Sequence, residues 1–306
     1  PIPVPGSADP RWKRRAIERL ISDARPDVVQ VEEAPGTRTA AIASSIARRL
    51  KVPLVLYSEA PLPPRLGFLA RWSRSRTLHR AQGLQAGNAM ARDLLARECP
   101  GIPIAVLPQL SVTPPLVAER RPPDEFTMAF VGRLVPEKGL DVLLRACVKL
   151  HGRWHLHVIG SGPGQVALEE LAERLGLGSR IHWLGALPPA DLGPRWPAID
   201  CLVQPSRSTA LWVERWSYTM VEAMACGVVA VASDAGALPD VVGQAGIVTP
   251  ENDVGALTTA LQRLRDDRQA RETLGAEGRK RVMDEFGDAA IAAKTLRFWK
   301  EMRGGV

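Results

Sequence analysis

The chain has 306 residues, of which 45% are hydrophobic and 24% are charged. This composition is typical of an ordinary globular protein, and the length allows two domains, each with its own core. No apolar run approaches the ~20 residues that span a bilayer, so we expect no transmembrane helix. The first residue is Pro1 rather than methionine, and we expect the start of the first domain to be missing.

Positive charge is concentrated in the first part of the chain. Residues 1–120 contain 18 Lys and Arg against 10 Asp and Glu, a net charge of +8, whereas residues 121–306 contain 22 against 23, a net charge of −1. Solvated surface arginines are one explanation. The other is an acidic partner, such as an anionic acceptor or an anionic membrane surface. We expect no nucleic-acid partner.

The cysteines and histidines indicate neither disulfides nor a metal site. The four cysteines have no paired spacing, which favours a reducing compartment and a cytoplasmic location: Cys99, Cys147, Cys201 and Cys226. His155 and His157 alternate in a predicted strand, but no third ligand is near them in the sequence. We therefore expect a structural role for both, and no metal or cofactor.

Strands and helices alternate in the first part of the chain, which predicts a parallel sheet covered by helices. The predicted strands are 27–31, 53–57, 83–86 and 104–108, and the predicted helices are 37–49 and 88–98. The segment 65–80 is basic and partly amphipathic. It fits an ordinary surface helix or a helix that docks on an anionic membrane.

Residues 109–124 are rich in proline, serine and threonine, which predicts a linker. A second alternating series follows. Its predicted strands are 127–131, 155–159, 181–184, 201–204, 228–232 and 246–249, and its predicted helices are 139–150, 164–176, 217–226, 253–267 and 289–303. The fold class is therefore α/β, with two doubly wound, Rossmann-like domains at 1–112 and 113–285 and a terminal segment at 286–306. Such domains bind ligands at the carboxyl ends of their strands, so we expect them to face a cleft.

Two cations follow the first strand of the second domain. Gly132 allows a close turn, Arg133 leaves the strand end, and Lys138 lies where the next helix begins. A cation opposes the dipole at a helix N-terminus, which makes sense if both side chains face an anion. Together they suit a diphosphate clamp. Two ordinary surface cations are the alternative.

Glycine turns follow the next two strands. Gly160 and Gly162 lie in a strand-to-helix turn, but their spacing is not that of a dinucleotide fold, and no acidic residue ends the following strand. We interpret the turn as lining the ligand site. Gly185 and Ala186 continue the third strand, where their backbone groups could meet the edge of a nucleobase.

Glu214 and Glu222 stand eight residues apart around the start of a predicted helix. Ser217 is the expected N-cap, which leaves the amides of Tyr218 and Thr219 as donors to an anion. Carboxylates accept hydrogen bonds from vicinal hydroxyls, so the pair suits a sugar and a ribose. A solvent-facing pair on a helix is the alternative, but these residues and the cations all follow strands of one predicted sheet.

Taken together, the motifs resemble the retaining nucleotide-sugar glycosyltransferases of family 4, which have the two-domain GT-B fold. The resemblance is most specific over 128–255. It rests on Val131-Gly-Arg-Leu-Val-Pro-Glu-Lys-Gly, Val158-Ile-Gly-Ser-Gly-Pro, Trp183-Leu-Gly-Ala-Leu-Pro, and the Glu214 to Glu222 spacing followed by Ala-Met-Ala-Cys-Gly.

The resemblance implies transfer of a sugar from a nucleoside diphosphate sugar to an acceptor hydroxyl, with retention and without metal. The implied catalytic residues are Arg133, Lys138 and Glu214, with Glu214 at the sugar and Glu222 at the ribose. The acceptor would be a saccharide or a lipid-linked group in envelope polysaccharide or glycolipid synthesis, reached at the inner face of the membrane. The terminal helix is expected to pack back on the first domain. The donor-binding set is Gly132, Arg133, Lys138, Gly160, Gly162, Gly185, Ala186, Glu214, Ser217, Tyr218, Thr219 and Glu222.

The chain departs from the family pattern in several places. Ser217 stands where the family often has glycine. At the domain junction the family commonly has Gly-Val-Asp, whereas this chain has Ser111-Val-Thr113. Members of the family often have a histidine in the first domain that assists on the acceptor side. This part of the chain offers only His79, which is poorly placed. Glu32, Glu33 or Glu59, at strand ends, are possible substitutes. A non-catalytic nucleotide-sugar-binding protein and a nucleotide-sugar epimerase of the same fold remain the alternative functions.

Overall fold

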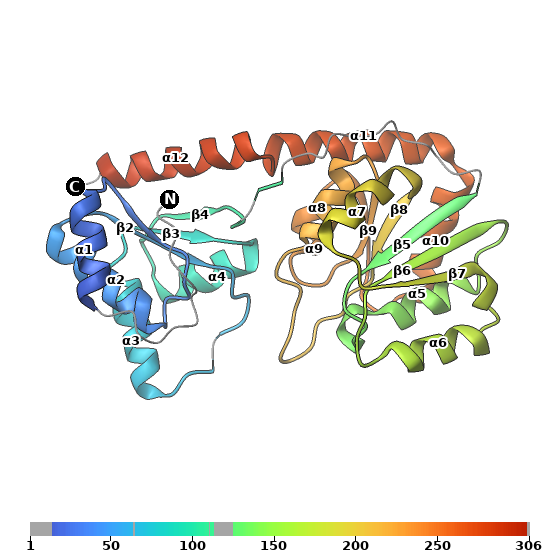
Figure 1. Ribbon diagram of the computed structural model, residues 1–306, viewed down its shortest axis with the longest axis horizontal. Coiled ribbons are helices and arrows are strands. Elements are labelled where there is room, and N and C mark those ends of the chain that lie inside the picture. Colours follow the sequence, from blue (N-terminus) through green and yellow to red (C-terminus); the bar gives the residue numbers. More distant parts are fainter. Residues whose placement is uncertain (1–13, 64, 110, 113–124, 305–306) are drawn as a thin grey trace. The chain divides into compact units, whose positions relative to one another are not determined.

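A computed structural model of the protein describes residues 14–63, 65–109, 111–112 and 125–304. The chain forms two units, 1–109 with 292–306 and 110–291, and each has its own parallel sheet (Figure 1). The expectation of two parallel-sheet α/β domains is confirmed. Most of the predicted linker lies outside the described residues. Among the described helices, none is long and apolar enough to cross a membrane.

Unit 1 has a four-stranded sheet in the order β1-β2-β3-β4. All its neighbouring strands run parallel. The helices α1 to α4 pack on one face of the sheet, where the side chains of Leu54, Leu56 and Leu84 lie fully buried. The elements are α1 (Arg14–Ala24), β1 (Val29–Val31), α2 (Arg38–Leu50), β2 (Leu54–Ser58), α3 (Phe68–Leu78), β3 (Gly83–Ala86), α4 (Ala89–Glu98) and β4 (Ile104–Val106).

The end of α12 (Asp288–Gly304) covers the other face of this sheet. Phe298 and Met302 pack against Val55, and the Trp299 indole donates a 2.5 Å hydrogen bond to Gln30 Oε1. A Cβ at Gly83 would stand 2.8 Å from the Phe298 ring, so glycine is needed for this close approach. The helix predicted near 289–303 is therefore present, one residue longer at each end.

Unit 2 has a six-stranded parallel sheet in the order β10-β9-β8-β5-β6-β7. Its elements are β5 (Phe126–Val131), α5 (Leu140–Cys147), β6 (Trp154–Ile159), α6 (Gln165–Arg174), β7 (Ile181–Gly185), α7 (Pro189–Leu192), β8 (Cys201–Gln204), α8 (Tyr218–Ala225), β9 (Val229–Ser233), α9 (Leu238–Val242), β10 (Gly246–Thr249), α10 (Val254–Asp266) and α11 (Arg268–Glu285). Short 3-10 helices occupy Pro136–Lys138, Gly178–Arg180 and Gly193–Ala198.

The strand order of unit 2 reverses between β5 and β8. From β5 the chain adds strands on one side through β6 and β7, and from β8 it adds them on the other side through β9 and β10. Helices α5, α6 and α10 pack on one face, and α7, α8, α9 and α11 on the other (Figure 1). Adjacent strands whose connections leave in opposite directions open a crevice at their carboxyl ends, which is where open α/β sheets bind ligands.

All ten predicted strands are present within two residues of their expected bounds, but α7, α9 and two longer helices were not predicted. One is α1, which buries only Ile17. The other is α11, which buries only Gly275, Gly278 and Val282. Its charged residues leave no clear apolar stripe, and a Cβ at Gly278 would stand 3.6 Å from the Met224 side chain of α8. Helix α11 therefore packs closely through small residues, which a hydrophobic pattern does not reveal.

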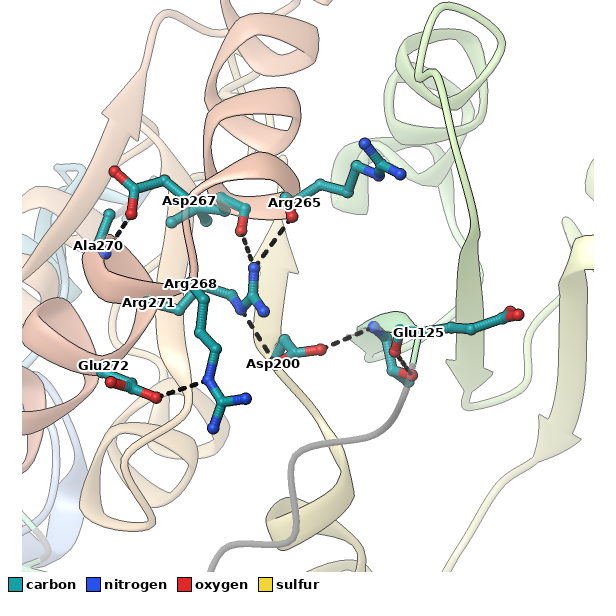
Figure 2. Close-up of polar contacts among 10 residues, drawn as sticks. Glu125, Asp200, Arg265, Asp267, Arg268, Ala270, Arg271 and Glu272 are labelled. Atoms are coloured by element: carbon teal, nitrogen blue, oxygen red, sulfur yellow. Dashed lines mark hydrogen bonds and ion pairs between the residues drawn. The ribbon is translucent and has the colours of Figure 1, made fainter.

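A buried ion pair joins α11 to the amino ends of β5 and β8 (Figure 2). Arg271 Nε lies 3.3 Å from Asp200 Oδ1, and Asp200 Oδ2 accepts a 2.9 Å hydrogen bond from the Thr127 amide. The same guanidinium donates to the Leu264 and Arg265 carbonyl oxygens at the end of α10. Both charged groups are thus removed from water and each has several partners, which is the condition for a stable buried pair.

Replacing Arg271 with methionine is expected to lower the free energy of unfolding by about 3–5 kcal/mol, because Asp200 would remain buried without its counter-ion. The control is Arg268→Met, which removes an exposed arginine paired with Glu272 one turn apart and should change stability far less. Chemical denaturation followed by circular dichroism measures both. Equal effects of the two substitutions would contradict the structural role of the Arg271 pair.

Candidate functional site

The loops that follow β5 and β8 meet at the carboxyl edge of the unit 2 sheet. The two strands are neighbours, with Met128 opposite Cys201. Beyond them, the Arg207 amide donates a 2.8 Å hydrogen bond to the Glu137 carbonyl oxygen. Gly139 has a φ of +69°, and a Cβ there would overlap the Pro205 carbonyl oxygen. The two loops are therefore in backbone contact at the point where the strand order reverses.

The centre of this region is an ion pair between Lys138 and Glu214. Lys138 Nζ lies 2.5 Å from Glu214 Oε2, and the side chains are only 17% and 8% exposed. The Ser206 hydroxyl donates a 3.1 Å hydrogen bond to the same carboxylate oxygen. The ammonium also lies 5.1 Å from the centre of the Trp212 ring, on its face. Each loop thus contributes one charge to a nearly dry pair.

Arg133 is not part of this pair. Its side chain is 64% exposed, and its guanidinium reaches Glu137 only at 3.9 Å. Lys138 is the last residue of the 3-10 helix Pro136–Lys138 and lies just before α5, close to the helix start expected from the sequence. Lys138 has a carboxylate partner in this structure, and the diphosphate clamp of Arg133 and Lys138 stays a prediction. Arg133 remains exposed and able to turn toward an anion.

Helix α8 begins as predicted at Ser217. The Ser217 hydroxyl accepts from the Met220 amide at 3.1 Å and donates to Gln204 Oε1 at 2.5 Å, which fixes the helix start to the end of β8. Tyr218 and Thr219 occupy the first turn of the helix. This geometry presents a helix N-terminus beside the ion pair, a place that favours negative charge.

Glu222 lies in the second turn of α8 and is half-buried. Burial raises the pKa of its carboxyl, because desolvation disfavours the charged form. Across the described part of the chain, no side chain forms a hydrogen bond or ion pair with this carboxylate. Two acceptor oxygens in a partly dry position are suited to the hydroxyls of a ligand.

The predicted glycine turns serve close packing of backbone on backbone. Gly160 has a φ of +142°, and a Cβ there would overlap the Gly132 carbonyl oxygen. A Cβ at Gly162 would lie 2.6 Å from the Leu134 carbonyl oxygen. The Gly160 amide in turn donates a 2.8 Å hydrogen bond to the Gly185 carbonyl oxygen. These glycines hold the loops after β5, β6 and β7 together, next to the exposed Ala186.

Three residues of this site were not predicted individually: Ser206, Trp212 and Gly236. The first two lie in the loop 205–213, whose unusual length was its only signal in the sequence. Gly236 has a φ of +56°, a Cβ there would overlap the Glu214 carbonyl oxygen, and the next amide donates 2.9 Å to that oxygen. It therefore fixes the backbone of Glu214.

Three other predicted candidates, His155, Glu32 and His79, have protein partners of their own. His155 Nε2 is hydrogen-bonded to Glu125 at 2.7 Å, and its ring lies against His182. No group of three metal-binding side chains occurs among the residues that the structure describes. In unit 1, Glu32 Oε1 accepts a hydrogen bond from the side-chain Nε2 of Gln30, and His79 Nδ1 is hydrogen-bonded to the Ser75 carbonyl oxygen at 2.8 Å.

Comparison with known proteins identifies the family. Residues 117–281 match the family described as Glycosyl transferases group 1. The chain belongs to this family. It is 32% identical over 170 residues to the GDP-mannose-dependent alpha-(1-6)-phosphatidylinositol monomannoside mannosyltransferase of Mycolicibacterium smegmatis, covering 53% of the chain and 44% of the relative. It is 35% identical over 162 residues to the D-inositol 3-phosphate glycosyltransferase of Mycobacterium marinum, covering 51% and 33%.

Solved structures share the fold of this chain. A glycosyltransferase from Rickettsia africae superposes with a TM-score of 0.79 at 16% identity, covering 99% of the chain and 85% of the other protein. Anabaena Alr3699/HepE in complex with UDP gives a TM-score of 0.76 at 17% identity, covering 94% and 82%. The GT-B expectation is confirmed by these likenesses. The chain spans less than half the length of the curated relatives that it matches.

Proposed function

We propose that this group 1 glycosyl transferase moves a sugar from a nucleoside diphosphate sugar to an acceptor hydroxyl, with retention at the anomeric carbon. The observation that carries the proposal is the Lys138–Glu214 pair, because it places a positive and a negative group together at the strand switch point. A nucleotide-sugar needs both: cations for its diphosphate and acceptors for its sugar hydroxyls.

In this proposal the phosphates approach Lys138 from the side of the α8 N-terminus, and Arg133 turns toward them from the loop edge. The bond between the anomeric carbon and the diphosphate oxygen breaks, and the bond to the acceptor oxygen forms on the same face. The proton of the acceptor hydroxyl is taken up by the departing diphosphate. The two cations and the helix N-terminus offset the charge that develops on the leaving group, so we propose no metal or cofactor.

The two glutamates bind hydroxyls in different parts of the donor. Glu214 is held by Ser206 and Lys138 through a single oxygen, Oε2. We propose that its carboxylate accepts from hydroxyls of the transferred sugar, and that the half-buried Glu222 accepts from the ribose. Gly132, Gly160, Gly162, Gly185 and Ala186 shape the backbone around the base and phosphates.

Replacing Lys138 with methionine is expected to weaken binding of a nucleoside diphosphate by ~1–3 kcal/mol, the usual effect of losing a charged hydrogen bond. Thermal stabilisation by UDP, GDP and ADP and by their sugars measures it, because a ligand at ~100 times its dissociation constant adds about 2.7 kcal/mol. Because Lys138→Met also leaves Glu214 unpaired, the double variant Lys138→Met, Glu214→Gln tests binding without a buried lone charge. Lys149→Met, an exposed lysine of the same unit, is the matched control.

Turnover separates this proposal from its alternatives. Glu214→Gln should bind nucleotide but lose most transfer or donor hydrolysis, with the anomeric configuration of the wild-type product read by proton NMR. An inverted product would contradict retention. Nucleotide binding without any turnover would favour a non-catalytic binding protein. A nucleotide affinity of Lys138→Met equal to that of the wild type would contradict the site assignment.

We also propose that unit 1 contacts an anionic membrane at the cytoplasmic face, where the acceptor would be a saccharide or lipid-linked group of an envelope polysaccharide or glycolipid. The support is α3, whose first turns expose Phe68, Leu69 and Trp72 by 83%, 77% and 56%. Arg76 stacks on Trp72 at 5.1 Å, and Arg71 is exposed beside them. Large apolar side chains among arginines are typical of helices that lie in an anionic interface.

Replacing both Phe68 and Trp72 with serine is expected to abolish sedimentation of the protein with vesicles that contain anionic lipid. The wild-type protein should bind such vesicles and leave neutral ones unbound, and added salt should weaken the binding. Val166→Ser, which removes a 66%-exposed apolar side chain from α6, is the control and should still bind. Binding by the double variant equal to wild type would contradict the membrane proposal.

A further inference from the structure

A basic cavity lies at the amino edge of the unit 1 sheet. Its volume is about 380 Å³, and its polar walls include Arg48, Lys51, His79 and Arg80. The remaining wall comes from residues just before β2 and β3, so the cavity lies where these strands start. Open α/β sheets bind their substrates at the carboxyl ends of the strands, which is the opposite edge of the sheet. This cavity therefore serves something other than the donor site.

No carboxylate contributes to the described wall of this cavity, although four of its side chains are basic. The neighbouring Arg49 of α2, in contrast, forms an ion pair with Glu18 of α1. Burial, together with the charges of Arg76 and Arg48, lowers the pKa of the Arg80 guanidinium. The cluster thus carries a mutual repulsion that a bound anion would relieve.

Arg80 also has a donor without an acceptor. Its Nε is buried and makes no hydrogen bond to the described residues, while its Nη1 donates a 3.3 Å hydrogen bond to Ser44 Oγ. A buried N–H of a charged group that lacks a partner costs stability, so the protein does not fully satisfy the Arg80 guanidinium. Arginine presents several donors in one plane, which matches the oxygens of a phosphate group.

The neighbouring groups are held in place around it. Lys51 is the C-cap of α2 in a left-handed conformation, with φ of +54°, and its amide bonds the last turn of the helix. His79 bonds the Ser75 carbonyl oxygen through Nδ1, which must then carry the proton, since a carbonyl only accepts. The Lys51 backbone and the His79 ring are thereby held by their own helix ends before any ligand binds.

We propose that this cavity is a binding site for a phosphate group, carried either by a soluble phosphate ester or by the head group of an anionic lipid. Arg80 and Arg48 donate hydrogen bonds to the phosphate oxygens, and Lys51 supplies further positive charge. The site does not depend on the proposed transferase function, because it shares no residue with the donor site.

Titration calorimetry with inorganic phosphate and with glycerol 3-phosphate tests the proposal. The titration uses the Lys138→Met chain, so that the donor site does not contribute. Saturable binding is expected, and Arg48→Gln and Arg80→Gln should each weaken it by roughly tenfold or more. Arg48 is exposed, so its variant should fold normally, as circular dichroism would verify. Arg174→Gln, an exposed arginine of unit 2, should leave the affinity unchanged.

Vesicles distinguish the two sources of phosphate. If a lipid head group is the ligand, phosphatidic acid vesicles should bind the protein more weakly after Arg80→Gln, and free phosphate should compete. If a soluble ester is the ligand, glycerol 3-phosphate should bind and vesicle binding should not respond to Arg80→Gln. Absence of saturable phosphate binding, or equal affinity in Arg48→Gln, Arg80→Gln and the wild type, would overturn the proposal.

Discussion

The candidate site depends on one buried ion pair, Lys138 with Glu214. Removing two charges from water is costly, and their attraction offsets that cost only when the geometry is good and other hydrogen bonds assist. Here Ser206 and the face of Trp212 supply that assistance. The pair brings together two loops that are 76 residues apart in the sequence. Their position follows from the sheet, because β5 and β8 are neighbours whose connections leave in opposite directions.

In the proposed function, the phosphate oxygens of a nucleotide-sugar would meet the Lys138 ammonium and its hydroxyls would meet the Glu214 carboxylate. Both charges would then find new partners without becoming unpaired. In the free protein, each charge protects the other from being buried alone. The glycines around the pair make this arrangement rigid, because Gly139 and Gly236 let one backbone approach another where any side chain would overlap a carbonyl oxygen.

Local patterns in the sequence predicted much of this structure. The strands at 83–86, 201–204 and 246–249 have their predicted bounds, and Ser217 is the predicted N-cap, because alternation and capping are encoded in neighbouring residues. The pairing of Lys138 with Glu214 was not predicted, since no local signal encodes a contact between distant loops. The packing role of Gly160 was missed for the same reason: its constraint is the Gly132 carbonyl oxygen of another loop.

Helix α11 could not be predicted from the sequence for a different reason. Its buried residues are two glycines and one valine, and the residue that pairs with Asp200 is Arg271, one of its many charged residues. Sequence patterns weigh the size and spacing of apolar groups, so a helix that packs closely through small residues gives little signal. The roles that the sequence suggested for Arg133 and Glu222 stay predictions. Among the described residues, Arg133 reaches only Glu137, at 3.9 Å, and Glu222 has no side-chain partner.

Phosphorus NMR of a bound nucleoside diphosphate tests the central claim most directly, since it observes the phosphates themselves. The account predicts that the β-phosphorus resonance of UDP, GDP or ADP shifts in the presence of the wild-type chain. It further predicts that the shift at saturation is largely lost in Lys138→Met, while Lys149→Met retains it. An identical shift in Lys138→Met and the wild type would show that the diphosphate does not meet Lys138, and would contradict the account.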